Sequence, residues 1–382
     1  MERYDILIVG AGPAGISTAL YLQQIAPERV SRTLVLEKAR HPRPKICAGG
    51  VMPDGVRLLR GLGLDIRDIP ATPVNLVQFG YNDQGVVFEE EGENTPFHFY
   101  IVLREELDAW LVARARERGI GILEESPVRK VSRSGDWIEV ATEHQTYQAR
   151  VVVGADGAQS VVRRAIGGGK ARYARALQVW APPPPGHPLH RERGVYFDFQ
   201  YVPQGIPGYI WDFPVQIRGQ AMRCWGIYDS HVLSGKAERR IREAFYERLA
   251  HYGYRPEEHR LYGGVIHHFY PDNVFSVPGV LLVGDAAGVD ALFGEGISPA
   301  LGYGKIAAQT IADAFAREDF SFRDYRERVM KSGLGTLLMQ RLRIASILYR
   351  LRSPVLQRFI WLRCAGAVRW SIRRMMDWAA RG

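Results

Sequence analysis

Cysteine is scarce in this chain, and long apolar runs are absent. The 382 residues include three cysteines, which show no metal-binding spacing and cannot all pair with one another. They are Cys47, Cys224 and Cys364. No uncharged apolar stretch is long enough to cross a bilayer, and the first strand begins by Tyr4, so we expect no signal peptide. These absences argue against a disulfide-stapled secreted fold, and they predict a cytoplasmic protein without a metal site.

Acidic residues are scarce at the C-terminal end. From Arg328 onward, twelve Lys and Arg face one acid, Asp377, within a net charge of +9 for the whole chain. Apolar residues recur there at helical spacing, and aromatic residues follow: Leu337, Ile344, Leu348 and Leu351, then Phe359, Trp361, Trp370 and Trp378. The pattern predicts a helical region that contacts an anionic membrane surface or closes a pocket as a lid, and one segment can do both. Nucleic acid is the competing partner for basic charge, but we expect none because no base-stacking module is present.

The first forty residues carry the pattern of a dinucleotide-binding unit. A short apolar strand over residues 4–9 precedes a glycine turn and a helix that runs to Leu22, and a second strand, over residues 33–36, ends at Glu37. The turn contains three glycines: Gly10, Gly12 and Gly15. The first permits a tight turn, the second lets a pyrophosphate approach the backbone N–H groups, and the third lets the helix pack closely on the strand. We expect Glu37 to accept hydrogen bonds from a ribose diol.

Two later segments repeat the combination of strand and turn. Residues 151–157 form a strand that ends in Asp156-Gly157, and residues 280–288 deliver Asp285 to the start of a helix rich in glycine and alanine. Asp285 is well placed for a ribityl hydroxyl, and the helix N-terminus for a phosphate. An NAD enzyme needs no such additional elements. With the N-terminal unit, they resemble the FAD-dependent oxidoreductases of the p-hydroxybenzoate hydroxylase type, which share the glutathione-reductase-like flavoprotein fold.

The resemblance extends from Met1 to about Phe320 and implies noncovalent FAD. Arg104, just before a helix expected over Glu105–Arg118, matches the arginine that these proteins place against FAD. Arg163 is a second match, for which a structural role as a helix-end charge is equally open. The implied FAD-contacting residues are Gly10, Gly12, Pro13, Ala14, Gly15, Glu37, Lys38, Lys45, Cys47, Ala48, Gly49, Arg104, Val128, Asp156, Gly157, Gly284, Asp285, Gly294, Gly296 and Ile297.

The predicted fold class is therefore α/β. We expect a Rossmann-like, glutathione-reductase-like FAD-binding domain, an inserted antiparallel β-sheet domain for the substrate, and a C-terminal helical region. The expected divisions are residues 1–73, 104–164 and 276–320 for the FAD-binding domain, 74–103 and 165–275 for the substrate domain, and 321–382 for the basic helical region. The substrate then lies between the sheet and the flavin, at the end of an apolar tunnel.

An aromatic segment predicts the character of that substrate. Tyr209, Trp211 and Phe213 alternate along a strand, so they share one face and form an apolar wall with few polar groups. Pro207 and Pro214 close both ends, which predicts a strand that is short or lies at a sheet edge. Ordinary sheet core is the alternative interpretation.

Three segments resemble the geranylgeranyl reductases. These are Lys45-Ile46-Cys47-Ala48-Gly49-Gly50, the Tyr-x-Trp-x-Phe-Pro strand over residues 209–214, and Gly294-Glu295-Gly296-Ile297. Ala48, and Leu292-Phe293 before Gly294, depart from the usual pattern. The resemblance implies FAD-dependent reduction of isolated carbon–carbon double bonds in prenyl chains on lipids, quinones or chlorophyll precursors.

The chemistry needs a proton donor as well as a hydride donor. An unactivated alkene accepts hydride poorly unless an acid protonates its other carbon, and aromatic faces stabilise the cationic character that develops. Cys47 is the first candidate for that acid or for a flavin gate, and Tyr209 is the second. A small buried hydrophobe remains the alternative for Cys47. Lys45 either favours the thiolate or binds the FAD phosphates, and we interpret His267-His268 as structural.

Two other classes of function stay open. One is a flavin monooxygenase or halogenase, although halogenases carry Trp-x-Trp-x-Ile-Pro where this chain has Tyr209 and Phe213. The other is a prenyl-group carrier without turnover. No second dinucleotide fingerprint is present for NAD(P)H, so electrons come either from a transient NAD(P)H visit or from ferredoxin. We expect a monomer that acts on a long-chain prenyl lipid at the membrane surface.

Overall fold

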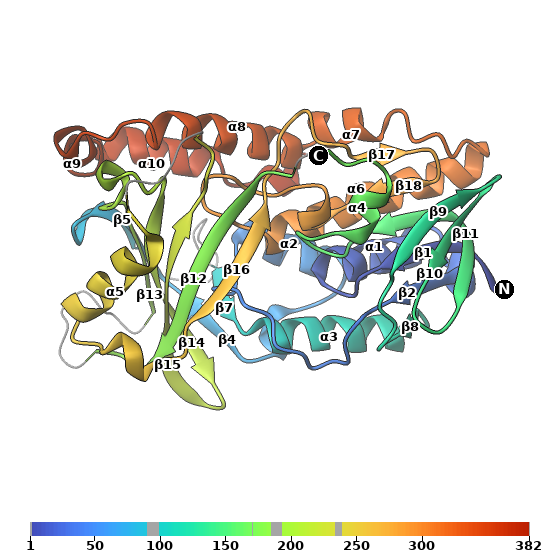
Figure 1. Ribbon diagram of the computed structural model, residues 1–382, viewed down its shortest axis with the longest axis horizontal. Coiled ribbons are helices and arrows are strands. Elements are labelled where there is room, and N and C mark those ends of the chain that lie inside the picture. The colour runs from blue at the N-terminus through green and yellow to red at the C-terminus, as the bar shows by residue number, and fades with distance from the viewer. Residues whose placement is uncertain (1, 90–98, 170, 185–192, 234–238, 382) are drawn as a thin grey trace.

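One half of the molecule is built around a mixed β-sheet. The computed structural model describes residues 2–89, 99–169, 171–184, 193–233 and 239–381. Five parallel strands give this sheet the order β18-β11-β1-β2-β8, and three antiparallel strands extend it. The strands are β1 (Glu2–Val9), β2 (Thr33–Leu36), β8 (Gly121–Leu123), β9 (Lys130–Ser134), β10 (Trp137–Ala141), β11 (Thr146–Gly154), β17 (Ser276–Val277) and β18 (Val280–Leu282). Helices α1 (Pro13–Ile25), α3 (Arg104–Glu117) and α6 (Ile297–Arg317) accompany it (Figure 1). The inner strands are continuous apolar runs, as expected for strands covered on both faces.

A second sheet has the order β16-β12-β15-β14-β13-β5-β6. It is antiparallel except for the parallel pair of β13 and β5. Its strands are β5 (Leu76–Tyr81), β6 (Gln84–Glu89), β12 (Tyr173–Ala181), β13 (Gly194–Asp198), β14 (Gly208–Ile217), β15 (Gln220–Asp229) and β16 (Tyr262–His267). A small third sheet joins β3 (Gly50–Val51), β7 (Phe99–Val102) and β4 (Ala71–Val74), so the boundary expected between residues 73 and 74 falls inside a strand.

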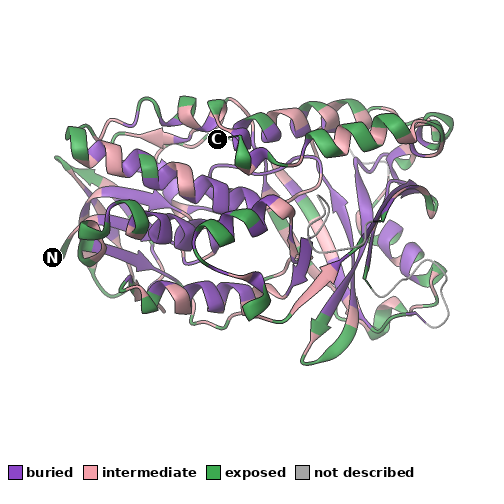
Figure 2. Ribbon diagram, turned by 180° about the vertical axis from the view of Figure 1, so that it is seen from behind, coloured by how far each residue is buried: buried purple, intermediate pink, exposed green. Residues whose placement is uncertain are grey.

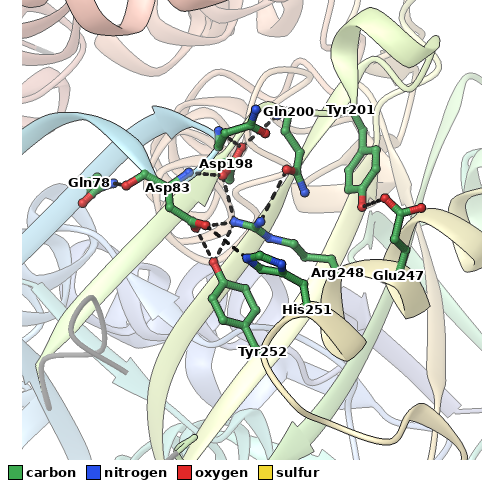
Figure 3. Close-up of polar contacts among 10 residues, drawn as sticks. Gln78, Asp83, Asp198, Gln200, Tyr201, Glu247, Arg248, His251 and Tyr252 are labelled. Carbon is green, nitrogen blue, oxygen red and sulfur yellow. Dashed lines mark hydrogen bonds and ion pairs between the residues drawn. The ribbon is translucent and has the colours of Figure 1, made fainter. Parts of the chain in front are cut away.

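Helix α5 (Ile241–His251) is fixed to the second sheet by a buried polar cluster (Figure 3). Arg248 Nη2 donates hydrogen bonds to Asp198 Oδ2 at 3.0 Å and to the Tyr252 hydroxyl at 2.6 Å. It also pairs with Asp83 in the hairpin between β5 and β6. Phe197, the neighbour of Asp198 on β13, points to the opposite face, so this cluster serves packing on the side away from the aromatic wall.

The C-terminal region is helical and lies along one long edge of the molecule (Figure 1). It contains α7 (Tyr325–Lys331), α8 (Gly333–Leu348), α9 (Pro354–Arg363) and α10 (Ala365–Arg374). Trp361 stacks on Phe199 with ring centroids 4.4 Å apart, and Trp378 packs where Gly302 of α6 leaves room for its ring. The short helices α2 (Pro53–Gly61) and α4 (Val161–Ala165) complete the set of α-helices in the described residues. Among these residues no helix is long and apolar enough to span a bilayer. The predicted fold class is confirmed.

Two local predictions were wrong. Strand β14 is ten residues long and lies between β13 and β15, not at an edge. Pro214 fits there because the pairing with β13 ends at Asp212, so the missing N–H of the proline leaves no partner unsatisfied on that side. The helix expected at Asp285 is a single 3-10 turn, and α6 begins only at Ile297, because a loop with left-handed glycines at Gly288 and Gly294 intervenes.

Candidate active site

Two glycines of the turn after β1, Gly10 and Gly15, have no space for a side chain. Gly10 has φ +108°, and a Cβ there would lie 2.5 Å from the carbonyl oxygen of Ala155. A Cβ on Gly15 would lie 1.9 Å from the carbonyl oxygen of Gly10. These contacts bring the start of α1 against the turn that follows β11, as the sequence pattern predicts for a dinucleotide site.

The N-terminus of α1 is open and positively charged. Gly12 is the N-cap, no side chain caps the helix, and no acid lies in its first turn. A Cβ on Gly12 would meet only the guanidinium groups of Arg43 and Arg104, at 3.9 and 4.0 Å. Free backbone N–H groups, a helix dipole and two arginines together form a site for a doubly charged phosphate group.

The carboxylates of Asp108 and Glu37 hold Arg104 and the backbone of the glycine turn in place. Arg104 donates from Nε and Nη2 to the two carboxylate oxygens of Asp108, at 2.8 and 2.9 Å. Burial is the largest single influence and lowers the pKa of Arg104, but the charge and hydrogen bonds of Asp108, with smaller contributions from other groups, together raise the pKa, so the guanidinium stays charged. The buried Glu37 accepts hydrogen bonds from the backbone N–H of Ala11 at 2.8 Å and of Ala39 at 3.0 Å.

Asp285 faces the N-terminus of the long helix α6. Its Oδ1 is 3.3 Å from the position of a Cβ on Gly296, the N-cap of that helix. Burial raises the pKa of Asp285, and the charges of Lys45 and Arg104 oppose the shift. Its carboxylate forms no hydrogen bond within the described ranges of the chain, so it is available to a ligand hydroxyl.

Asp156 has a different environment. Its Oδ2 accepts the backbone N–H groups of Val161 and Val162 at 2.6 and 3.2 Å and thereby caps α4. Its Oδ1 has no hydrogen-bond partner among the residues that the structure describes. Burial raises the pKa of this carboxyl. The side chain therefore shapes the turn, and a role toward FAD stays a prediction.

The chemistry of these groups fits FAD. An uncapped helix N-terminus with two arginines suits the pyrophosphate, and the carboxylates of Glu37 and Asp285 lie where ribose and ribityl hydroxyl groups need acceptors. The other predicted FAD contacts follow the parallel strands in sequence, and their roles stay predictions. They are Pro13, Ala14, Lys38, Lys45, Ala48, Gly49, Val128, Gly157, Gly284, Gly294 and Ile297.

We expect Glu37→Ala to lower the FAD content of the purified protein. The substitution removes an acceptor for a ribose, and it also leaves the backbone N–H groups of Ala11 in the glycine turn and of Ala39 after β2 without their partner. The ratio of flavin to protein absorbance measures the effect, and Glu105→Ala, at an exposed position of α3, is the control. Unchanged flavin occupancy in Glu37→Ala would argue against the ribose assignment.

Cys47 lies between the two halves of the molecule. Its carbonyl oxygen accepts a hydrogen bond from Gln178 Nε2 of β12 at 3.5 Å, and its Sγ accepts one from the backbone N–H of Gly49 at 3.4 Å. Its S–H donates to no group in the part of the chain that the structure describes. Beyond Cys47, a Cβ on Gly49 would lie 1.9 Å from the Val102 carbonyl oxygen, two residues before Arg104. A Cβ on Gly50 would lie 3.9 Å from the Phe213 ring. The segment thus faces both the FAD site and the second sheet.

The aromatic wall has the predicted alternation. Tyr209, Trp211 and Phe213 are buried in the main core, whereas Ile210 belongs to the smaller core on the other face of the sheet. Gly226 on β15 makes room for the indole, because a Cβ there would lie 2.0 Å from the Trp211 ring. Four more aromatic rings extend the wall around Tyr209. The distances between their ring centroids and that of Tyr209 are 5.1 Å for Phe197, 5.4 Å for Tyr228, 5.7 Å for Phe199 and 6.1 Å for Phe293.

The Tyr209 hydroxyl is already engaged. It donates to the carbonyl oxygen of Phe293, in the loop before α6. Burial raises the pKa of Tyr209 well above its usual value, and the charge of Asp290 adds to the shift. Burial also raises the pKa of Cys224 to about 12. The Tyr209 hydroxyl and the Cys224 thiol are therefore poor proton donors, and this favours Cys47 as the donor of the proton to the alkene.

Helix α8 reaches into the same loop, which the sequence analysis did not anticipate. Arg341 Nη1 donates to Asp290 Oδ2 at 2.8 Å and also pairs with Glu295, directly before the N-cap of α6. Asp290 also accepts backbone N–H groups of the loop, and Tyr349 donates its hydroxyl to the Leu292 carbonyl oxygen at 2.6 Å. The C-terminal region therefore holds the loop that follows Asp285.

Sequence signals existed for some of the residues that were missed. Arg341 is four residues from both Leu337 and Ala345 and occupies a buried position on an otherwise apolar helical face. Asp108 is four residues from Arg104 on α3, the spacing of a helical ion pair. Arg43, in the loop after β2, had no such signal.

The remaining candidates have structural contacts. Arg163 is buried and donates to the carbonyl oxygen of Ala158 and the Tyr173 hydroxyl, at 2.6 and 2.8 Å. His267 contacts Arg163 and the Asp285 carbonyl oxygen, and His268 contacts the Tyr228 hydroxyl. Burial lowers the pKa of the two histidines to about 4 and about 3, so both are neutral.

Known proteins share this architecture. A family model for the FAD binding domain matches residues 3–196. Digeranylgeranylglycerophospholipid reductase 2 of Methanopyrus kandleri is 30% identical over 84% of this chain and 79% of its own length. Among solved structures, a geranylgeranyl bacteriochlorophyll reductase-like protein from Thermoplasma acidophilum has a TM-score of 0.77 at 21% identity, covering 97% of this chain and 96% of that chain. The flavin-dependent halogenase CmlS has a TM-score of 0.69 at 21% identity, covering 94% and 67%, which is a likeness of fold alone.

Proposed function

The chain belongs to the geranylgeranyl reductase family of FAD-dependent oxidoreductases, and on this premise we propose that it saturates isolated double bonds of a geranylgeranyl or polyprenyl chain. The carrier is a lipid, a quinone or a chlorophyll-type precursor. The relatives named for a digeranylgeranylglycerophospholipid favour a glycerophospholipid among these carriers.

The aromatic wall opposite the Cys47 segment carries this proposal. The Phe213 ring is 3.9 Å from the position of a Cβ on Gly50, so the wall and the segment meet. Three buried rings in a row suit a long apolar chain, and they offer few of the polar groups that orient a small polar substrate. We assign substrate binding to Tyr209, Trp211 and Phe213.

When bound in its reduced form, FAD supplies the hydride. We assign to Cys47 the proton that the second alkene carbon requires, because its S–H is uncommitted in the described chain and its segment faces both halves of the molecule. The faces of the aromatic rings stabilise positive charge that develops on the substrate. Tyr209, whose hydroxyl is held by Phe293, serves to position the chain.

We propose NAD(P)H or ferredoxin as the electron donor. The one complete dinucleotide fingerprint, at Gly10 to Gly15, is assigned to FAD. Gly167 and Gly169 follow helix α4 and have left-handed φ values of +73° and +65°, as in a turn, so they offer no second strand-to-helix site. Either donor therefore visits transiently.

An oxygen-dependent halogenase or monooxygenase is the second candidate, favoured by the fold shared with CmlS. A halogenase or monooxygenase needs oxygen for turnover, whereas the proposed reductase does not. We expect the photoreduced protein to be reoxidised under argon by a geranylgeranyl lipid, at a rate that depends on the lipid concentration. Stopped-flow absorbance of the flavin measures this. A reoxidation rate that requires air and does not change with the lipid concentration would favour the halogenase or monooxygenase.

A further inference from the structure

The exposed apolar side chains of this protein gather on its C-terminal helices. Of the eight large hydrophobic residues that are exposed in the described chain, five lie between the end of α8 and α10. They are Ile347, Val355, Leu356, Phe359 and Trp370, with Phe359 55% and Trp370 64% exposed. We call these five residues the apolar patch. Figure 2 shows the C-terminal helices exposed along their outer side. Isolated exposed residues are normal in soluble proteins, but this concentration marks a contact surface.

Positive charge accompanies the patch. Arg343, Arg350, Arg358 and Arg363 are exposed on the same helices and turns. None of the four forms an ion pair within the residues that the structure describes. The acid of this region, Asp377, is bound to Arg57 of α2 at 2.7 Å and does not offset them. Long arginine side chains beside exposed rings and aliphatic groups suit a surface with anionic phosphates above an apolar layer.

Helix α9, which carries three residues of the patch, is packed against rings that lead to the substrate site. Trp361, two residues after the exposed Phe359, points inward and stacks on Phe199 at 4.4 Å between ring centroids. The Phe199 ring in turn contacts Tyr209 of the aromatic wall at 5.7 Å. Gln357 fixes the start of α9 by donating to the Leu351 carbonyl oxygen at 2.9 Å. One helix thus presents apolar groups outward and touches the wall inward.

We propose that the apolar patch and its arginines dock the protein on an anionic lipid bilayer, with α9 and α10 lying in the interface. Leu337 and Trp378 cannot take part, because both are buried in packing contacts. This narrows the membrane contact expected for the whole basic tail to one face of it. The reason for docking rests on the proposed function, because a prenyl lipid substrate resides in the membrane. The test of docking measures membrane binding and needs no turnover.

Vesicle flotation of the full-length protein tests the docking. We expect binding to vesicles of phosphatidylglycerol and phosphatidylcholine, weakening as salt rises because the attraction is screened over about 1 nm at moderate ionic strength. Phe359→Ser with Trp370→Ser should weaken binding on the order of tenfold, and Arg358→Glu with Arg363→Glu should remove its dependence on anionic lipid. The controls are Ile25→Ser with Val265→Ser, and Lys130→Glu with Arg164→Glu, all at exposed positions outside the C-terminal helices.

The outcomes separate the possibilities. Weaker flotation of the Phe359 and Trp370 pair, and flotation of the Arg358 and Arg363 pair that no longer depends on anionic lipid, support docking when thermal unfolding and the controls are unchanged. Equal flotation of all variants overturns it. A second result also overturns it: the wild-type protein does not bind vesicles but forms a dimer, and Phe359→Ser with Trp370→Ser makes it monomeric. The apolar patch would then bind a second copy of the chain. If the vesicles bind but no prenyl substrate is reduced in detergent, the proposed function fails and the docking surface stands.

Discussion

Cys47→Ala should lower the rate of anaerobic prenyl reduction by about a hundredfold or more while leaving FAD bound. Loss of a positioned general acid typically costs 10²–10⁴-fold. The thiol is the candidate because the Cys47 carbonyl oxygen is bound by Gln178 of the second sheet and the next glycine pair approaches Phe213 of the aromatic wall. FAD should remain because the groups that fit its pyrophosphate and ribose belong to other residues. Single-turnover reoxidation of the reduced protein by a geranylgeranyl lipid measures the rate, and the flavin-to-protein ratio measures retention.

Two comparisons sharpen this test. Cys364→Ala removes a thiol at the junction of α9 and α10 and should leave the rate unchanged. Cys47→Ser keeps a small polar group but replaces the thiol with a much weaker acid, so it should be slow as well. If Cys47→Ala and Cys47→Ser both keep the full single-turnover rate, the thiol is a packing residue and the assignment of proton donor is wrong.

Arg341→Leu should destabilise the protein by about 3–5 kcal/mol, the usual cost of breaking a buried ion pair by removing one partner. Asp290 and Glu295 would be left buried without their shared counter-charge. Burial alone would lower the pKa of Arg341, but these two carboxylates outweigh it and raise the pKa, which indicates strong coupling. Because the loop they hold leads into α6, weaker FAD retention should accompany the loss. Urea unfolding and flavin content measure the two effects.

Arg343→Leu is the matched control for that variant. Arg343 lies two residues further along α8 but is exposed and forms no ion pair in the described part of the chain. Its removal should change the free energy of unfolding by less than about 0.5 kcal/mol. Equal stabilities of the Arg341 and Arg343 variants would show that the contact between α8 and the loop contributes little.

The sequence predicted the parts of the site that depend on local geometry. Gly10 and Gly15 are required by close backbone contacts, with the carbonyl oxygens of Ala155 and Gly10, and the fingerprint places the two glycines at a fixed spacing. The alternation of Tyr209, Trp211 and Phe213 follows from the period of a strand and needs no knowledge of its neighbours. The same period could not show whether that strand is central, because its position depends on pairing with β13 and β15.

What the sequence did not reveal depends on contacts between distant segments. Arg341 meets Asp290 across about fifty residues, and Gln178 meets Cys47 across an even longer separation. The basic tail shows the same limit. Charge and spacing identified a helical region with two possible roles, but only packing separates the inward Trp361 from the outward Phe359.

The mass of the product after one anaerobic turnover tests the central claim most directly. The reduced protein is mixed under argon with a geranylgeranyl glycerophospholipid, and the lipid is extracted for mass spectrometry. The account predicts a gain of two hydrogens for each double bond reduced, in proportion to the flavin oxidised, and no dependence on air. A product that forms only in air and carries an added oxygen or halogen would contradict it.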